Sequence, residues 1–345
     1  MVKVHTLQLK LDWNLIDSIG KLNRFDASWG TIEKREGASL KQLKSVATVR
    51  SVGASTRIEG SKLSNEQIDV LLENLDISQL EERDEQEVVG YFEVMDLISS
   101  QHGDIDITEG NIKNLHNLLL SHRGEDEWHR GLYKQHSNSV EATLTDGTKQ
   151  IIFETATPGA ETEDAMINLI DWYQKEQEVD PLVRCAVFAY EFISIHPFQD
   201  GNGRLSRLLT ILLLLKHGYK WIEFVSLEHE IESRKNEYYQ VLKSCQSERP
   251  NEDISLWLNF LFGSLANIQG QLMDKLTSTG AKASLNAKEK SVLTLIENSS
   301  GISTGKISKK LGIPIPTLKR TLSKLVKMNQ IEAQGVGRGT FYLAV

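Results

Sequence analysis

Residues 196–207 read His196-Pro197-Phe198-Gln199-Asp200-Gly201-Asn202-Gly203-Arg204-Leu205-Ser206-Arg207. Apolar residues recur at helical spacing on both sides of this segment, over residues 181–195 and 208–215. Asp180 followed by proline is typical of a helix start, and Gly218 is typical of the left-handed residue that follows a helix end. The pattern predicts two helices joined by a tight loop.

This loop combines four kinds of group that act on phosphate esters. Gly201–Gly203 opens the second helix, where exposed N–H groups and the helix dipole favour an anion. Arg204 and Arg207 lie three residues apart on one helix face and can form a fork for phosphate oxygens. Asp200 suits Mg²⁺ held together with phosphates, and His196, with an ordinary pKa of about 6.5, suits a general base. Each feature alone is typical of an ordinary turn or helix end, but the combination indicates phosphoryl or nucleotidyl transfer.

The segment matches the Fic signature, His-Pro-Phe-x-Asp-Gly-Asn-Gly-Arg-x-x-Arg, at every fixed position, so the chain resembles Fic proteins. The resemblance implies a helical core that transfers AMP from Mg·ATP to a Tyr, Thr or Ser hydroxyl of a target protein. It implies that His196 is the base and that Asp200 holds Mg²⁺. The expected ATP-binding residues of the loop are Gly201, Asn202, Gly203, Arg204, Leu205, Ser206 and Arg207. The intact Gly203 favours AMP transfer over the phosphate transfer of the related Doc-type kinases.

The composition is that of an ordinary globular protein of two or three domains. The chain has 345 residues, of which 40% are hydrophobic and 25% charged. No apolar stretch is long enough for a bilayer, and residues 1–6 lack the apolar core of a signal peptide, so we expect a cytoplasmic protein without membrane contact. Cys185 and Cys245 form no metal-ligand or redox pattern and are expected to be core residues.

An N-terminal region, residues 1–105, is expected to be helical, with helices over about 40–52, 66–74 and 84–99. Its residues Ser55, Glu59 and Gly60 match Ser/Thr-x-x-x-Glu-Gly/Asn, the inhibitory motif of Fic proteins. The resemblance implies that Glu59 pairs with Arg207, occupies its guanidinium and disturbs the triphosphate of ATP. In some relatives the same glutamate helps to remove AMP. The alternative is an ordinary helix that ends at Gly60 with a solvated Glu59.

Residues 106–262 are expected to form the Fic core. Asp146-Gly147 between two alternating segments predicts a β-hairpin. In similar proteins a hairpin at this place docks the target by strand addition, so Ile152, Phe153, Glu154 and Thr155 are assigned to target docking. Tyr238 and Gln246 are expected to contact the base or ribose of ATP. For the tyrosines at 238 and 239, burial in the core is the alternative.

The C-terminal part differs from the rest in charge. Residues 284–345 contain ten Lys and Arg against three Asp and Glu, a net charge of +7 in a chain of net charge −8. The pattern predicts a linker over 263–283, then three helices and a Gly-rich hairpin, which is a winged helix. The third helix is expected to turn Leu318, Leu322, Leu325 and Val326 inward. The residues expected on its open face are Thr317, Lys319, Arg320, Ser323, Lys324 and Lys327, with Arg338 on the wing. DNA binding accounts for this charge, while protein docking or homodimer formation is the alternative.

The predicted protein is therefore mainly α-helical: an N-terminal helical region, a Fic core with a β-hairpin flap, and a C-terminal winged helix. The function that we infer from the sequence is an adenylyltransferase restrained by Glu59. Two alternatives remain at this point. One is an enzyme that removes AMP with the same site. The other is a DNA-binding regulator whose Fic core senses a nucleotide.

Overall fold

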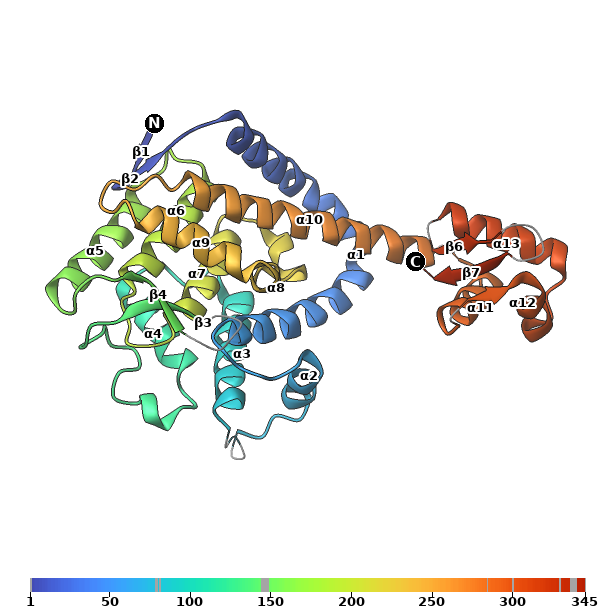
Figure 1. The fold of residues 1–345 in the computed structure, drawn as a ribbon, viewed down its shortest axis with the longest axis horizontal. Helices are drawn as coiled ribbons and strands as arrows, with labels where there is room; N and C mark the ends of the chain where they lie inside the picture. Colours follow the sequence, from blue (N-terminus) through green and yellow to red (C-terminus); the bar gives the residue numbers. More distant parts are fainter. Residues whose placement is uncertain are drawn as a thin grey trace. The chain divides into compact units, whose positions relative to one another are not determined.

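The structure is a computed structural model that describes residues 2–77, 80, 82–143, 149–283, 285–299, 301–328, 330–335 and 340–344. The predicted mainly helical fold is confirmed, and the chain divides into two compact units, Met1–Gln269 and Gly270–Val345 (Figure 1). Within the described ranges, no helix combines the length and the apolar character that crossing a membrane requires.

The elements that begin in the first unit are, in chain order, β1 (Val2–Val4), β2 (Leu7–Leu9), α1 (Trp13–Ile58), α2 (Asn65–Glu73), α3 (Arg83–Gln101), α4 (Glu109–Leu119), the 3-10 helix η2 (Gly124–Asp126), β3 (Ser139–Thr143), β4 (Lys149–Glu154), α5 (Ala160–Lys175), α6 (Pro181–Ile195), α7 (Asn202–Lys216), the 3-10 helix η3 (Lys220–Phe224), α8 (Leu227–Ser233), α9 (Lys235–Gln246) and α10 (Ser255–Ala283). The antiparallel pair of β1 and β2 was not predicted from the sequence.

Side-chain caps mark the starts of several helices, and the helix start predicted at Asp180 is confirmed. The Ser64 side chain accepts from the Gln67 N–H and the Gln67 side chain accepts from the Ser64 N–H, which is a capping box at the start of α2. Thr108 caps α4 and Asp180 caps α6 in the same way, through side-chain oxygens that accept backbone N–H groups. These starts depend on a few neighbouring residues, which is why a local pattern predicts them.

The helix expected over residues 40–52 is part of a much longer one, since α1 spans 46 residues. Leu15, Leu22 and Trp29 are buried at intervals of seven residues, as are Leu40 and Ala47. This stripe lets α1 pack against α3, α8 and η3. Three glycines in the first forty residues of the chain lower the helix propensity there, so the sequence predicted only the second half of the helix.

The helices α6 and α7 form the centre of the first unit and pack against each other (Figure 1). In α6 every residue from Leu182 to Ile195 is buried, and in α7 every residue from Arg204 to Leu215 is buried. A helix that is buried on all sides shows no amphipathic pattern, and it is positioned by the elements around it. The loop between these two helices is therefore held on a rigid base.

The predicted hairpin is present as the antiparallel pair of β3 and β4, with a shift of register between Val140 and Glu141. The expected turn at Asp146 and Gly147 lies outside the described residues. The pairing of Ser139 with Glu154 places the two outer ends of the hairpin side by side.

The prediction that residues 263–283 form a linker after a helix end is wrong. These residues lie within α10, which is helical from Ser255 to Ala283. Buried residues Leu265, Ile268, Leu272 and Leu276 continue the helical spacing through this part. The glycines at 263 and 270 suggested a break, but glycine only weakens a helix by about 1 kcal/mol, and a long apolar stripe outweighs that cost.

The second unit contains the predicted winged helix. Its elements are α11 (Ala287–Glu297), β5 (Ile302–Ser303), α12 (Thr304–Leu311), α13 (Ile315–Lys327), β6 (Ile331–Gln334) and β7 (Phe341–Ala344), and its sheet has the order β5-β7-β6. Leu318, Leu322 and Leu325 enter its core as expected. The expectation for Val326 is wrong, since this residue is 36% exposed beside the inward-facing Leu325. Arg338 lies outside the described residues.

Gly90 marks a close approach of α3 to α4, where a side chain does not fit. A Cβ atom at this position would lie 2.2 Å from the Leu119 carbonyl oxygen, so the backbones would have to separate. We expect Gly90→Ala to destabilise the first unit by about 1–3 kcal/mol. Gly110→Ala on α4, where a Cβ meets nothing within 4 Å, is the control and is expected to be neutral or stabilising. All six tryptophans lie in the first unit, so urea unfolding followed by tryptophan fluorescence measures the stability of this unit in both variants. Equal stability of the two variants would contradict the packing.

Candidate active site

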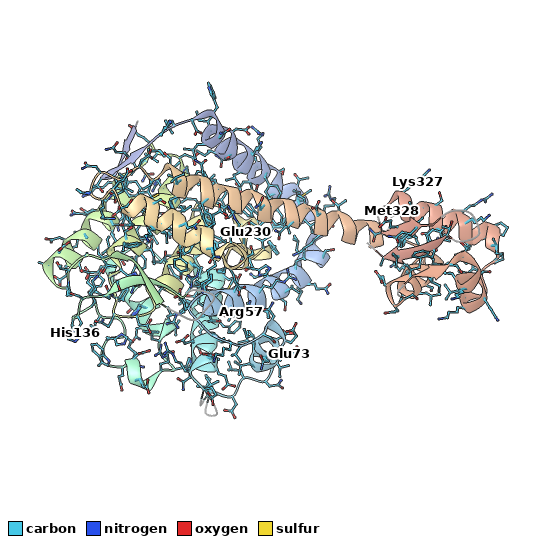
Figure 2. All side chains as sticks on the ribbon, viewed as in Figure 1. Arg57, Glu73, His136, Glu230, Lys327 and Met328 are labelled. Atoms are coloured by element: carbon cyan, nitrogen blue, oxygen red, sulfur yellow. The ribbon has the colours of Figure 1, made fainter. Side chains whose placement is uncertain are left out.

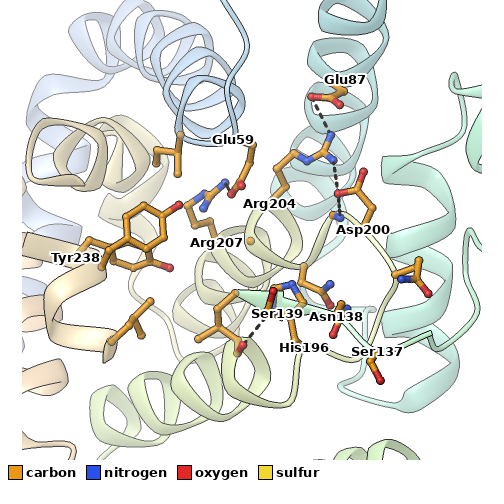
Figure 3. Close-up of a pocket in the computed structure, with 18 of the residues that line it drawn as sticks. Glu59, Glu87, Ser137, Asn138, Ser139, His196, Asp200, Arg204, Arg207 and Tyr238 are labelled. Carbon is orange, nitrogen blue, oxygen red and sulfur yellow. Dashed lines mark hydrogen bonds and ion pairs between the residues drawn. The ribbon is translucent and has the colours of Figure 1, made fainter. Parts of the chain in front are cut away.

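A cavity of about 490 Å³ lies over the loop between α6 and α7 (Figure 3). Its walls come from the C-terminal end of α1, from α3, from the residues before β3, from the loop itself and from α9. The volume is within the range of small-molecule sites, which is about 300–1,000 Å³. Helices far apart in the sequence therefore meet around residues 196–207.

His196 ends α6 in the left-handed conformation, with φ 53° and ψ 59°, and its ring lines the cavity. Its Nδ1 atom lies 3.3 Å from the Ile193 carbonyl oxygen. When Nδ1–H donates this bond, Nε2 keeps its lone pair. Burial lowers the pKa of His196 to about 4, against the opposing hydrogen bond to Ile193. The imidazole is therefore neutral near pH 7 and can accept a proton.

Two side chains hold the loop in place. Asn202 binds the backbone of Phe198 twice, accepting from its N–H at 2.8 Å and donating to its carbonyl at 2.7 Å. The His116 ring stacks on the Phe198 ring at 3.8 Å between centroids. His116 Nδ1 accepts from the Gly131 N–H at 2.8 Å, so its Nε2–H donates to the Asp200 carbonyl at 3.0 Å. Asn202 thus fixes the loop, and the backbone N–H groups at the start of α7 remain available for an anion.

Asp200 belongs to a network of carboxylates and guanidinium groups. Its oxygens accept from Arg123 at 3.1 Å, from Arg204 at 3.5 Å and from the Gly201 N–H at 2.6 Å. Glu87 of α3 accepts from Arg123 at 3.0 Å and lies 3.3 Å from Arg204 (Figure 3). Burial raises the pKa of Asp200, but Arg204, Gly201 and Arg123 outweigh it and hold this pKa far below its ordinary value. Asp200 is therefore ionised at any physiological pH.

Glu59 reaches the cavity from the end of α1 and binds Arg207. Its Oε1 atom accepts from Arg207 at 2.8 Å, and the same guanidinium donates to the Ser55 side chain at 2.8 Å and to the Ser55 carbonyl at 3.0 Å. The side chain of Glu59 is 31% exposed and that of Arg207 is 4% exposed. The expected pairing of these two residues is present, and the alternative of a solvated Glu59 is wrong.

The carboxylate of Glu59 also covers Gly203 at the start of α7. A Cβ atom at Gly203 would lie 2.3 Å from Glu59 Oε1 and 3.3 Å from the Arg207 guanidinium. The carboxylate thus occupies the place over a helix N-terminus that favours an anion. Gly60, with φ 113°, then ends the turn that follows α1.

Of the other residues that were expected to bind ATP, only some line the cavity. Tyr238 lines the cavity, as does its neighbour Tyr239. Gln246 does not, because its side chain is buried against the Ser194 hydroxyl of α6. Leu205 and Ser206 are buried on the inner side of α7 rather than in the cavity wall.

The flap residues are only partly described. The side chains of Ile152 and Glu154 lie outside the description. Phe153 is half-buried, and the Thr155 hydroxyl binds Asn138 and Lys134 at the base of the hairpin. Neither of these two described side chains lines the cavity. The structure thus joins the end of β4 to the cavity wall through Asn138.

Sequence reasoning missed several residues of the wall, among them Glu87 of α3, Ser137 and Asn138 before β3, and Ser139 at the start of β3. Glu87 lies among acidic residues at a helix start, which the sequence does not distinguish from an ordinary first turn. Arg204 and Arg207 both line the cavity but bind different partners here, so they do not form one fork in this state.

The residues fit a Mg²⁺ ion that arrives with phosphates. Asp200 is ionised and its side chain is 41% exposed, although Arg123 and Arg204 compete for its oxygens. Among the described residues, no group of three or more His, Cys, Asp or Glu side chains could hold a metal. A single carboxylate together with phosphate oxygens is the coordination that Mg²⁺ commonly takes in proteins.

Comparisons with known proteins agree with this geometry. The Fic/DOC family model matches residues 106–214, and a winged helix-turn-helix DNA-binding model matches residues 285–332. The chain therefore contains a Fic/DOC domain followed by a winged helix-turn-helix domain. This confirms the resemblance that the loop indicated.

Two curated relatives are protein adenylyltransferases named fic-1. The one from Caenorhabditis briggsae is 30% identical over 172 residues, covering 47% of this chain and 31% of that protein. The one from Caenorhabditis elegans is 29% identical over 172 residues, covering 47% of this chain and 30% of that protein. The chain thus spans about a third of the length of these relatives. The similarity supports the assignment of the Fic/DOC domain and does not by itself establish the activity of this chain.

Solved structures show the same fold. A Fic family protein from Desulfovibrio desulfuricans G20 matches with a TM-score of 0.65 at 21% identity, covering 100% of this chain and 98% of that chain. A Fic domain containing signaling protein from Bacteroides thetaiotaomicron matches with a TM-score of 0.57 at 26% identity, covering 76% of this chain and 94% of that chain.

The contact between Glu59 and Gly203 can be tested through stability. Gly203→Ala must shift the Glu59 carboxylate and so strain its bond to Arg207, and we expect it to destabilise the first unit by about 1–2 kcal/mol. In a Glu59→Gly background the obstacle is absent, and the same change is expected to cost less than about 0.5 kcal/mol. Urea unfolding of the four proteins gives the coupling energy. An equal cost in both backgrounds would place the carboxylate elsewhere.

Proposed function

We propose that this chain is a protein adenylyltransferase that transfers AMP from Mg·ATP to a Tyr, Thr or Ser hydroxyl of a target protein, and that Glu59 restrains it. The observation that carries the proposal is the position of the Glu59 carboxylate, 2.8 Å from Arg207 and over Gly203, in the cavity that His196 lines. A neutral base, an anion-binding helix start and a buried guanidinium around one cavity are the groups that this reaction requires.

The reaction follows from the placement of these groups. His196 accepts the proton of the target hydroxyl, whose oxygen forms a bond to the α-phosphorus of ATP. The bond between the α-phosphorus and the bridging oxygen to the β-phosphate breaks, and diphosphate leaves with the electron pair. The start of α7 and Arg207 bind the negative charge of the phosphates. Mg²⁺, held at Asp200, would neutralise phosphate charge during this step.

The restraint by Glu59 is electrostatic and steric. Arg207 is buried and three of its N–H groups donate to Ser55 and Glu59, so a γ-phosphate must compete with a carboxylate for the same guanidinium. The carboxylate also repels an anion at the start of α7. ATP that binds beside Glu59 is displaced from the line of attack, and a displacement of about 1 Å can cost about a hundredfold in rate.

The removal of AMP remains the alternative activity of this site. Its physical basis is that a carboxylate next to the cavity can orient a water molecule toward a bound AMP-protein. Both activities need His196, so the direction of the Glu59 effect distinguishes them. Removal requires Glu59, whereas transfer is limited by it.

We expect Glu59→Gly to raise AMP transfer to the protein itself by about tenfold or more, because the guanidinium of Arg207 becomes available to the triphosphate. His196→Ala added to this variant is expected to lower the rate by about 10²–10⁴-fold. Incorporation of labelled AMP measures both. Glu59→Gln, which keeps the size of the side chain without its charge, is the matched control and is expected to lie between wild type and Glu59→Gly.

Each alternative has a distinct outcome in these assays. Unchanged or lower incorporation in Glu59→Gly would contradict the restraint. Release of AMP from a premodified protein by wild type but not by Glu59→Gly would favour removal. Absence of both activities, together with tight binding to duplex DNA, would favour the regulator.

We also propose that the winged helix binds duplex DNA through α13. Lys319, Arg320, Ser323, Lys324 and Lys327 are exposed along this helix and line an open groove. Figure 2 shows Lys327 near the C-terminal end of α13. Lys324 donates to Glu289 of α11 at 2.8 Å, so its charge is partly compensated. A helix with this many exposed cations suits the phosphates that border a major groove.

The double variant Lys319→Ala, Arg320→Ala is expected to weaken binding to random-sequence duplex by about 10–100-fold and to reduce the slope of log K against log salt by about 2. For the wild type, affinity should fall steeply between about 50 and 200 mM salt. Fluorescence anisotropy measures both. Lys290→Ala on α11 is the control for a lost surface charge away from α13. Equal binding by the double variant and this control would contradict the assignment of α13.

A further inference from the structure

Lys134 lies under the active-site loop and is buried, with 2% of its surface exposed. Its ammonium group donates to three oxygens: Asn138 Oδ1 at 2.9 Å, Thr155 Oγ1 at 2.8 Å and the Ile195 carbonyl at 3.1 Å. An ammonium group has three N–H donors, so all of them are used. Its backbone N–H also donates to the Pro197 carbonyl at 2.8 Å.

The three acceptors belong to three different parts of the site. Asn138 lines the cavity and donates from its side chain to the Phe198 carbonyl at 2.8 Å. Thr155 follows the last residue of β4 and donates to the Asn138 carbonyl at 3.0 Å. Ile195 is the last residue of α6 and precedes His196. One ammonium group therefore binds the end of the hairpin, the cavity wall and the residue that precedes the base.

The arrangement is costly for a residue with only a structural role. Among the described side chains, no carboxylate lies within ion-pairing distance of the Lys134 ammonium group, and its partners are neutral oxygens. Burial lowers the pKa of Lys134 to about 8, with Glu161 acting in the opposite direction. A buried cation whose described partners are all neutral is unfavourable, and such groups occur more often at functional sites than elsewhere.

The contact to Ile195 explains what the cation can do there. His196 adopts a left-handed conformation that residues other than glycine rarely take, with φ 53°. The carbonyl groups at the end of α6 have no partner within the helix, and Lys134 binds the one next to His196. The same ammonium group holds Thr155, so the end of β4 and the base keep a fixed separation.

We propose that Lys134 is a positioning residue of the active site. It holds the end of the β3–β4 hairpin at a fixed distance from the backbone of His196. The inference rests on the proposed AMP transfer, in which His196 must meet the hydroxyl of a target bound along the hairpin. Lys134 does not line the cavity, so it acts through Asn138, Thr155 and Ile195.

The charge of Lys134 has a second effect on the base. The charged groups that act on the His196 imidazole are Lys134, Glu59 and Asp200; the cation lowers the pKa of His196 and the two carboxylates raise it. Removing the cation makes protonation of the imidazole easier. While the His196 ring stays buried, a substitution of Lys134 is therefore expected to raise the pKa of His196 through the loss of this charge.

The test compares Lys134→Met with Lys113→Met, both in the Glu59→Gly background. Lys113 lies on α4, pairs with Glu109 and is 31% exposed, so it is a matched control outside the cavity wall. We expect Lys134→Met to lower the rate of labelled AMP incorporation by about 10–100-fold and to leave ATP affinity, from isothermal titration, within about threefold. The control is expected to change neither quantity by more than about threefold.

Two further measurements do not depend on activity. Amide hydrogen exchange of residues 149–155 should become faster in Lys134→Met, and the His196 pKa, from an NMR titration of the imidazole, should rise. If Glu59→Gly shows no AMP transfer, the proposed function fails, while exchange and titration still decide the role of Lys134. Lys134→Gln, which can donate hydrogen bonds without a charge, is a second variant in case Lys134→Met does not fold.

The proposal is overturned by any of four results. The first is incorporation within threefold of the parent in a folded Lys134 variant. The second is a loss of ATP affinity as large as the loss of rate. The third is unchanged exchange of residues 149–155 together with an unchanged pKa of His196. Failure of both Lys134 variants to fold would make this residue a stabiliser of the core and would also overturn it.

Discussion

The guanidinium of Arg207 is the group on which the arrangement of this site depends. It is buried at the centre of the first unit, where a charge without a partner is strongly unfavourable. Ser55 and Glu59 supply three acceptors for it from α1. In the proposed function this cation binds the triphosphate, and the carboxylate of Glu59 takes the place of that anion when no nucleotide is bound.

The helix α1 brings this carboxylate to the cavity from a distant part of the chain. Arg57, two residues before Glu59, binds Glu232 of α8 through two hydrogen bonds of 2.7 and 3.0 Å. Lys235 of α9 donates to the Ile58 carbonyl at 2.7 Å. The end of α1 is thus held by two other helices. Movement of the Glu59 side chain alone leaves these contacts intact, whereas movement of the helix end would break them.

Much of this protein could be predicted from short segments. The residues proposed as base, metal ligand, anion site and phosphate-binding arginines lie within the twelve positions 196–207, so a sequence pattern alone identifies them. Caps at Ser64, Thr108, Asp180 and Asn286 mark helix starts through bonds to residues two or three positions away. The winged helix was predictable because its elements are short, strongly patterned and adjacent in sequence.

What the sequence by itself determined is therefore the local chemistry: the anion-binding loop, the helix starts and the motif that contains Glu59. Only the tertiary structure decided which distant side chains meet that loop. Glu87 enters the network of Arg204 and Asp200 from α3, Lys134 binds Thr155 and Ile195 at once, and Gln246 turns toward Ser194 and away from the cavity. The physical reason is that hydrogen bonds within a turn are set by neighbouring residues, whereas contacts between helices are set by the packing of whole apolar faces.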